Sequence, residues 1–295
     1  SWGNPMQEIL PRSSSKMLQA LPLVESGAAD RFGLGTEQLA LACASHNGNP
    51  MHTEGVQKWL SGLDLGESDL RCGAHWPTGR KTANALVKAG EKPCQFHNNC
   101  SGKHSGFLTL NKHLGGGAEY VDINHPVQKA ALAAFEETTG ETSSGYGIDG
   151  CSAPNFATSL KGLATAMARM GDGTRGTGGL RLVEAMAKHP LLVAGEGRAC
   201  SEMMDAIGGR VVLKTGAEGV FIAILPEQGL GVAVKIEDGA TRASECATAA
   251  LLVRLGVADG AHPMIQKRMT PALKNAAGLV VGGIRPADGL LSVKR

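Results

Sequence analysis

A serine and a lysine three positions apart, Ser13 and Lys16, stand where a serine-rich segment leads into an apolar helical pattern. This spacing is close to one helical turn, so both side chains lie on one face of the expected helix. A serine hydroxyl becomes a nucleophile when a base takes its proton, and a lysine held neutral by burial can be that base. The alternative is a serine that caps the helix and a lysine in solvent, which is the commoner use of both residue types.

Two further triplets bear on this choice. Ser-His-Asn at residues 45–47 has the form Ser-x-Asn, and Lys-Thr-Gly at residues 214–216 ends an apolar strand pattern. With Ser-x-x-Lys they follow, in order, the motif set of penicillin-binding proteins and class A β-lactamases. In such a site the first serine attacks a carbonyl and its lysine takes the proton. Ser45, held by Lys214, then passes a proton to the leaving amine.

The assignment of the attacking residue follows from position. Ser13 is the predicted nucleophile because it stands at a helix N-terminus with its base one turn further on, and Ser45 is the rival candidate. Backbone N–H groups of Ser13 and Ala217 are expected to form the oxyanion hole. Asn47 completes the Ser-x-Asn triplet as a predicted substrate contact.

The elements that carry these residues are predicted from hydrophobic periodicity. Helical patterns with capping and stop signals occupy most of residues 13–206, with a helical portion over about 30–207. Apolar runs at 210–214, 220–225 and 230–236 are joined by glycine-containing turns, which predicts an antiparallel meander. A helix over 242–255 and a strand at 279–284 follow. We therefore predict a single α+β domain over 1–295, with a sheet formed by the N-terminal segment and about 208–295. The abrupt start at residues 1–9 is typical of the end of a strand or hairpin.

Composition limits the class of protein. The 295 residues are 42% hydrophobic with a formal charge of +2, which is too balanced for a nucleic-acid-binding chain. No apolar run reaches the roughly 18 residues that span a bilayer, so no membrane partner is expected. Seven cysteines, an odd number spread widely, predict a reducing compartment and a cytoplasmic location.

A second cluster of chemistry-bearing residues lies at 97–108, where polar residues and glycines lead into an apolar helix. Such a helix start suits an anion or carbonyl site lined by backbone N–H groups, and an ordinary capped turn is the alternative. Cys100 and Lys103 stand here, three apart. Cys-x-x-Lys is a weak zinc signal because Cys-x-x-Cys is the usual pattern, so the residues alone favour buried, unrelated side chains over a metal site.

Six segments together resemble one family, the L-asparaginases of the Rhizobium etli thermolabile type. The most specific is Asn-Asn-Cys-Ser-Gly-Lys-His at residues 98–104; the others are residues 11–16, 43–48, 149–155, 214–219 and 238–242. The resemblance runs from about residue 5 to residue 256. It implies a serine-β-lactamase-like fold, a homodimer, and hydrolysis of L-asparagine to L-aspartate and ammonia.

The resemblance also implies site residues. It implies two Ser-Lys pairs, Ser13 with Lys16 and Ser45 with Lys214. It further implies a metal site, expected to hold zinc, formed by Cys100, Lys103 and Cys200. Two thiolates and a neutral lysine would leave a fourth position open to water or substrate.

Four more residues are candidate substrate contacts. Arg12 and Glu218 have the charges to meet the α-carboxylate and α-amino groups of an amino acid. His104 and Asp149 are expected to orient a ligand or the amide, and a structural hydrogen-bonding role is the alternative for each.

Other functions stay open at this point. A β-lactamase, a DD-peptidase or a serine-type glutaminase could use the same fold and motifs. A non-catalytic zinc-binding or amino-acid-binding module is the alternative from another class.

Overall fold

The computed structural model of the chain describes residues 1–291. Its central sheet has the antiparallel order β5-β6-β7, formed by β5 (Val212–Thr215), β6 (Val220–Leu225) and β7 (Leu230–Lys235). Every residue of β6 is buried, as expected for a middle strand of β-branched and aromatic residues covered on both faces. Lys214 pairs in register with Ile222, near the end of β5. The predicted meander is confirmed, and the fold is α+β.

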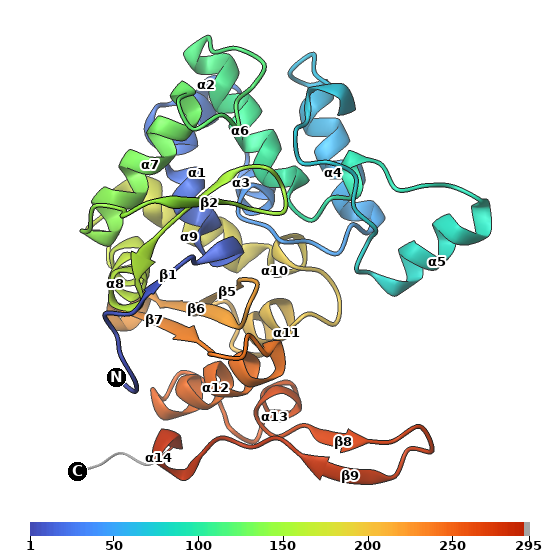
Figure 1. The fold of residues 1–295 in the computed structure, drawn as a ribbon, viewed down its shortest axis with the longest axis vertical. Helices are drawn as coiled ribbons and strands as arrows, with labels where there is room; N and C mark the ends of the chain where they lie inside the picture. Colours follow the sequence, from blue (N-terminus) through green and yellow to red (C-terminus); the bar gives the residue numbers. More distant parts are fainter. Residues whose placement is uncertain (292–295) are drawn as a thin grey trace.

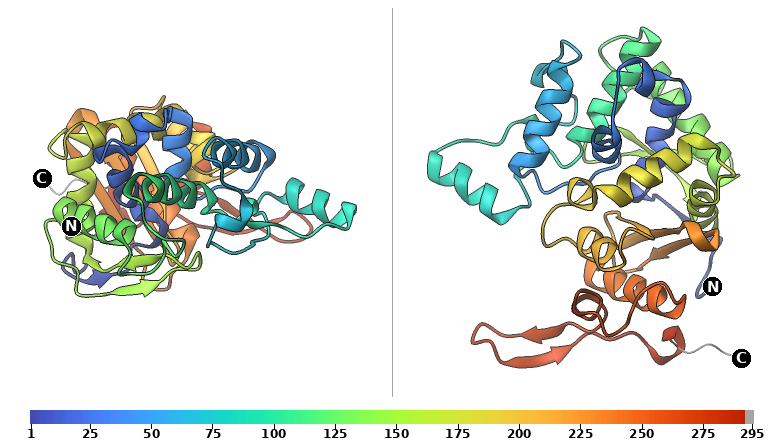
Figure 2. Two further views of the ribbon diagram at one scale, coloured as in Figure 1. Left: turned by 90° about the horizontal axis from the view of Figure 1, so that it is seen from above. Right: turned by 180° about the vertical axis from the view of Figure 1, so that it is seen from behind.

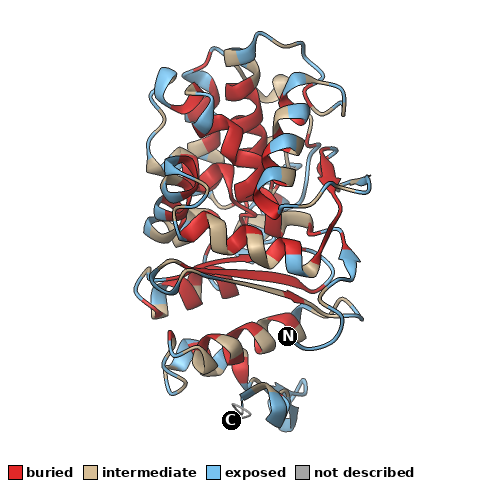
Figure 3. Ribbon diagram, turned by 90° about the vertical axis from the view of Figure 1, so that its left-hand side faces the viewer, coloured by how far each residue is buried: buried red, intermediate tan, exposed pale blue. Residues whose placement is uncertain are grey.

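Helices cover both faces of this sheet, so the molecule has layers (Figure 3). One face carries α8 (Leu160–Gly171) and the large helical layer beyond it, and the other carries α12 (Thr241–Arg254). The apolar core continues from the sheet into the helical layer. This continuity places the end of β5 against the interior of the helical layer.

The helical layer is built around α1 (Lys16–Glu25), which packs against α3, α6, α7 and α9. Residues 16–24 of α1 are all buried, so this helix is interior on every side. Burial of Lys16 follows from its place at the first residue of this helix. The surrounding helices are α2 (Ala28–Arg31), α3 (Thr36–Ala42), α4 (Pro50–Ser61), α5 (Arg80–Ala89), α6 (Ser101–Leu114), α7 (Pro126–Thr139), α9 (Thr177–Lys188), α10 (Pro190–Val193) and α11 (Ala199–Ala206).

Two small sheets lie outside the central one. Strand β1 (Glu8–Ile9) pairs with β4 (Thr158–Ser159), and β2 (Tyr146–Ile148) pairs with β3 (Pro154–Phe156). The N-terminal segment was expected in the main sheet, but within residues 1–291 its only strand pairs with β4. The reason is local: β4 leads directly into α8, and Leu160 and Lys161 N–H groups bond to Gln7 O and Pro5 O.

The C-terminal part forms a separate appendage. After α13 (Pro263–Met269), β8 (Ala272–Lys274) and β9 (Val280–Gly283) form a two-stranded hairpin, followed by α14 (Asp288–Leu291). The strand predicted at 279–284 is therefore present, with a partner that the sequence did not indicate. The hairpin projects from the body beyond α13 (Figures 1 and 2). No helix within residues 1–291 is long and apolar enough to cross a membrane.

Candidate active site

Three distant segments meet at the hydroxyl of Ser45. Lys16 at the start of α1 places Nζ 3.0 Å from Ser45 Oγ, and Lys214 at the end of β5 places Nζ 2.7 Å from the same oxygen. Both lysines and the serine are buried. Lys16 also donates to Ala44 O, and Lys214 donates to Thr215 O at 2.8 Å. The structure thus forms one Lys-Ser-Lys cluster.

The electrostatics of this cluster suit proton transfer near neutral pH. The pKa of Lys214 is lowered to about 7, mainly by burial and next by the positive charge of Lys16, with a smaller effect of Arg198, while Cys200 opposes the shift. An amine with this pKa is largely able to accept a proton at physiological pH. The Ser45 hydroxyl lies between this amine and that of Lys16, so it can pass a proton in either direction.

Ser13 lies beside this cluster in a 3-10 turn, Arg12–Ser15, that precedes α1. It is half-buried, and its side chain makes no hydrogen bond to the residues that the structure describes. The turn touches the end of β5: a Cβ on Gly216 would stand 2.6 Å from Pro11 O and 3.2 Å from Ser14 N. The glycine of the Lys-Thr-Gly triplet is therefore required for this approach. Lys16 bonds to Ser45 rather than to Ser13.

A charged cluster lies at the outer side of the same turn. Arg12 donates to Asp149 Oδ1 at 2.7 Å and to Glu218 Oε1 at 2.5 Å. Its backbone N–H donates to Asn155 Oδ1 at 3.0 Å. Three of the predicted substrate contacts are thus brought together as one ion-paired group.

The backbone at this group is strained. Arg12, Ser152 and Glu218 have φ values of 53°, 69° and 59°, in the left-handed region that glycine normally occupies. Such conformations persist where surrounding contacts fix them, and they are concentrated at functional sites. The only other non-glycine residue with positive φ among residues 1–291 is Asp64, at 57°.

The third cluster contains two of the three predicted metal ligands, Cys100 and Lys103. Lys103 Nζ lies 3.0 Å from the Sγ of Cys151, and the Cys100 thiol also hydrogen-bonds Cys151. Cys200 lies beside Lys214 instead: its Sγ accepts the Thr215 N–H at 3.3 Å, and it raises the pKa of Lys214. The thiol brought to Cys100 and Lys103 is therefore Cys151.

Charges inside this cluster favour a thiolate. The hydrogen bond from Cys100 lowers the pKa of Cys151 well below its usual value, and the same bond raises the pKa of Cys100. Burial opposes charge on Lys103, but the two cysteines raise its pKa. His104 hydrogen-bonds Tyr120 OH through Nδ1 at 2.8 Å, and its side chain also lies against Cys151 and lowers the pKa of that thiol. No three His, Cys, Asp or Glu side chains of residues 1–291 form a metal cluster, so a metal here would require Lys103 as a ligand.

Two further predicted site residues, Asn47 and Ala217, lie outside the charged cluster and the cysteine cluster. Asn47 uses its side-chain amide within the protein: Nδ2 donates to Glu196 O at 3.0 Å, and Oδ1 accepts from Thr78 and Arg198. Ala217 is exposed in the β5–β6 turn, next to Gly216. Sequence reasoning missed Cys151, which stands in one of the six family-like segments but is expected from the sequence to be a buried core thiol, and Arg198, which lies in a turn outside all of them.

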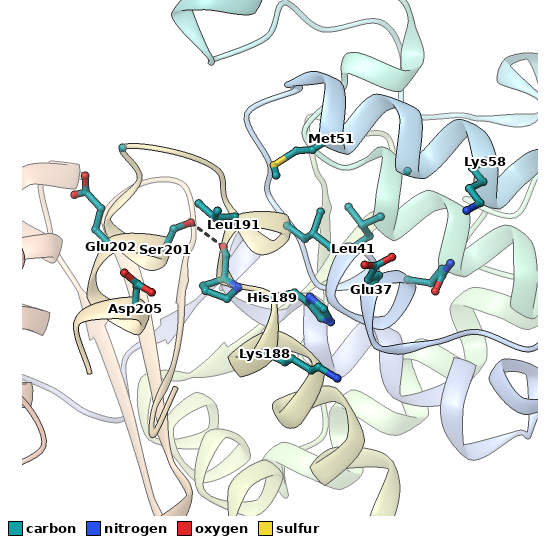
Figure 4. Close-up of a pocket in the computed structure, with 15 residues that line it drawn as sticks. Glu37, Leu41, Met51, Lys58, Lys188, His189, Leu191, Ser201, Glu202 and Asp205 are labelled. Carbon is teal, nitrogen blue, oxygen red and sulfur yellow. Dashed lines mark hydrogen bonds between the residues drawn. The ribbon is translucent and has the colours of Figure 1, made fainter. Parts of the chain in front are cut away.

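A cavity of about 590 Å³ lies apart from these clusters, between α3, α4, α10 and α11. Figure 4 shows Leu41, Met51 and Leu191 among its walls. Ser13, Lys16, Ser45 and Lys214 do not line it. It is connected to the site through α10, since Val193 O accepts the Ser45 N–H at 2.9 Å.

Comparisons with known proteins identify the family of the chain. No curated protein matches the chain in a sequence search. The model of the L-asparaginase II family matches residues 1–286. Because this match covers nearly the whole chain, the chain belongs to the L-asparaginase II family and is a hydrolase that acts on L-asparagine.

Proposed function

We propose that the chain hydrolyses L-asparagine through an acyl-enzyme whose protons move along a relay formed by Lys16, Ser45 and Lys214. The observation that carries this proposal is the pair of hydrogen bonds, 3.0 and 2.7 Å, from two buried lysine amines to one hydroxyl. An isolated buried ammonium is costly, so two of them on one hydroxyl indicate that at least one amine is neutral.

Ser13 is the proposed nucleophile. Its hydroxyl is half-buried and makes no hydrogen bond to the described residues, whereas Ser45 is 4% exposed and already engaged by both amines. Ser13 Oγ attacks the side-chain carboxamide carbon as its proton passes to Lys16, which in turn passes a proton through Ser45 to the neutral amine of Lys214. The oxyanion is held by the N–H groups of Ser13 and Ala217. Hydrogen bonds of this kind tighten when substrate binds, so the contact of Lys16 with Ser45 in the free enzyme is compatible with this role.

The second half of the reaction uses the same relay. Ser45 gives a proton to the departing nitrogen, which leaves as ammonia, and takes one back through Lys214. A water molecule then attacks the ester at Ser13, and its proton enters the relay. L-aspartate leaves with the Ser13 hydroxyl restored.

The α-substituents of the substrate define its orientation. Arg12 carries the cation for the α-carboxylate, and Glu218 and Asp149 carry anions for the α-ammonium group. In the free protein these groups pair with one another, so substrate replaces their mutual ion pairs. His104 and Asn47 do not touch the substrate in this proposal. They hold the residues around the site in place through the hydrogen bonds within the protein described above.

The identity of the nucleophile is tested with Ser13→Ala and Ser45→Ala. Trapping with hydroxylamine converts an aspartyl ester to the β-hydroxamate, which is measured together with ammonia release. We expect no hydroxamate from Ser13→Ala, and slow acylation by Ser45→Ala. Hydroxamate formation by Ser13→Ala would assign the attack to Ser45.

A zinc ion held by Cys100, Lys103 and Cys151 is part of the proposal. Two sulfurs and one amine, with a fourth position open, fit a borderline-soft cation, and His104, which lies against Cys151, belongs to the same buried group. When bound, zinc would supply a Lewis acid that holds and polarises a carboxylate or carbonyl of the substrate. Lys103 and Cys100 must lose protons to bind it, so affinity should fall at low pH.

Elemental analysis of protein purified without added metal tests this site. We expect near-stoichiometric zinc that Cys151→Ser removes and Cys200→Ser, the matched control, retains. Loss of zinc in Cys200→Ser with retention in Cys151→Ser would restore the set expected from the sequence.

Substrate selectivity separates the remaining functions on this scaffold. Ammonia release from L-asparagine and L-glutamine is compared with hydrolysis of nitrocefin, a chromogenic lactam. We expect turnover of asparagine well above that of glutamine and no lactam hydrolysis. Binding of asparagine without ammonia release would instead make the chain a non-catalytic amino-acid-binding module.

The finer classification and the assembly are also proposals. A buried α1 that starts with Ser-x-x-Lys, beside a strand that ends in Lys-Thr-Gly, supports a serine-β-lactamase-like fold of the Rhizobium etli type. The continuous core supports one domain. Seven unpaired cysteines support a reducing, cytoplasmic location. The exposed apolar hairpin β8–β9 supports a homodimer, because an isolated two-stranded ribbon is marginally stable in water.

A further inference from the structure

The turn between α10 and α11, residues 193–198, holds the segment that carries Ser45; we call it the clamp turn. Val193 O accepts the Ser45 N–H at 2.9 Å, and Glu196 O accepts from Asn47 Nδ2 at 3.0 Å. Arg198 closes the clamp turn, with Nη1 3.2 Å from Asn47 Oδ1 and 3.5 Å from Ser45 O. Both ends of residues 45–47 are therefore bonded to one short turn.

Asn47 has little freedom to move within the clamp turn. Gly195 has a φ of +109°, and a Cβ there would stand 2.7 Å from Asn47 Nδ2. On the opposite side, Thr78 Oγ1 donates to Asn47 Oδ1 at 3.0 Å, and Gly79 N–H donates to Asn47 O at 3.0 Å. The orientation of the Asn47 amide is thus fixed by close packing on one side and by hydrogen bonds on both.

The clamp turn is itself attached to two helices. Ser201 Oγ accepts the Gly195 N–H at 3.2 Å and donates to Pro190 O at 2.7 Å, the bond drawn in Figure 4. Arg268 of α13 donates to Gly197 O at 2.7 Å and pairs with Glu202 and Glu245. The clamp turn is therefore held in place by its neighbours. From this fixed turn Arg198 donates to Asn47 Oδ1 and Ser45 O.

We propose that Arg198 is a positioning residue for asparagine hydrolysis, which holds Asn47 Oδ1 and Ser45 O so that the Ser45 hydroxyl stays between the two lysine amines. This inference rests on the proposed relay. Displacement of Ser45 Oγ by about 1 Å would break one of its two short hydrogen bonds, and misplacement of that size can lower a rate about 10²-fold. A planar guanidinium suits this role because it presents several donors in fixed directions and is always charged.

Arg198→Met is compared with Arg181→Met, a matched loss of an arginine that pairs with Asp30 on the surface. We expect Arg198→Met to lower kcat about 10²-fold with KM changed less than about threefold, and Arg181→Met to retain both. Arg198→Lys should recover part of kcat because an ammonium can reach one of the two oxygens. A raised KM with unchanged kcat would make Arg198 a substrate-binding residue and overturn the proposal.

A double-mutant cycle with Asn47→Ala separates positioning from general stability. Because Arg198 acts through Asn47, the double variant should be no slower than Asn47→Ala alone. Fully multiplicative losses would overturn the proposal. If Arg198→Met fails to fold, Gly195→Ala, which pushes Asn47 from the same turn, takes its place: a kcat loss is expected there, and wild-type kcat would overturn the proposal.

Ser45→Ala distinguishes failure of this inference from failure of the proposed function. If Ser45→Ala retains wild-type kcat, the relay is wrong and the role of Arg198 is lost with it. If Ser45→Ala loses activity while Arg198→Met keeps the wild-type kcat, the relay stands and only the positioning role is refuted.

Discussion

Burial of two amines on one hydroxyl gives Lys214 a proton affinity far from that of a surface lysine. Its pKa is lowered to about 7, against an ordinary value of 10.5, mainly because burial disfavours the ammonium. Below pH 7 the side chain is protonated in both the folded and the unfolded chain, and the cost of burying the charge is fully present. Between pH 7 and 10.5 the unfolded chain binds the proton and the folded chain does not, so stability rises with pH.

This rise of stability with pH gives a prediction for Lys214→Met. The variant should gain stability relative to the wild type most strongly at pH 6, and this advantage should shrink as pH rises to 10. Urea unfolding of both proteins across that range measures the difference. A difference that is constant with pH would contradict a lowered pKa at Lys214.

The catalytic rate should depend on the same proton. If neutral Lys214 serves the relay, kcat/KM of the wild type rises as pH increases through about 7. A pH–rate profile from ammonia release locates this limb. A limb that lies below pH 5.5 would point to a carboxylate in place of Lys214.

At the scale of elements, the site depends on the contact between α3 and α6. The N-terminal turn of α6 carries Cys100 and Lys103, and the C-terminal end of α3 leads to Ser45. Gly102 lets the two helices approach: a Cβ there would stand 2.3 Å from Leu41 O and 2.8 Å from Leu41 C. Backbone atoms cannot move aside cheaply, so this glycine sets the spacing of two of the three clusters.

Gly102→Ala should therefore lower the free energy of unfolding by about 1–3 kcal/mol, the usual cost of overpacking. The matched control is Gly117→Ala, where a Cβ meets no atom within 4 Å. We expect a change under about 0.5 kcal/mol in the control. Urea denaturation compares the two, and equal effects would show that the α3–α6 contact tolerates a methyl group.

These elements differ in how far the sequence could predict them. The meander was found because its runs are apolar and separated by glycine turns, whereas β1 to β4 have two or three residues each and no measurable period. Ser45 and Lys214 were found because triplets mark them. Cys151 was missed because the cluster forms between α6 and a distant loop, and spacing along the chain does not show which buried cysteine arrives there.

At the scale of the whole molecule, the hairpin β8–β9 is the part least supported by the rest. Leu279, Val280 and Val281 are each 65% exposed. The two ends of the hairpin lie next to each other, since Ile284 N–H donates to Pro271 O at 3.1 Å. It lies beyond α12 and α13, away from α1 and β5 (Figure 1). Removal of the hairpin should therefore leave the active site unchanged.

Replacement of residues 272–283 by a short Gly-Ser link tests the proposed homodimer. If the hairpin covers its apolar strands with a second copy, sedimentation equilibrium should show a shift from dimer to monomer. The kcat for each site should stay within about twofold, since the relay lies in the body. A dimer that persists after excision would place the contact elsewhere on the surface.

Four non-glycine residues among residues 1–291 have a positive φ, and substitution of these residues by glycine can test whether thermal stability can be raised without loss of activity. An L-residue in this region costs roughly 1–2 kcal/mol, and glycine relieves most of that cost while adding some entropy to the unfolded chain. Asp64 is 97% exposed at its side chain and belongs to none of the three clusters, so Asp64→Gly should raise Tm slightly with unchanged kcat/KM. Ser152→Gly should bring a similar gain but loosen the loop of Asp149 and Cys151. Differential scanning calorimetry with parallel kinetics would show whether attempts to stabilise this enzyme by backbone relaxation must avoid its active site.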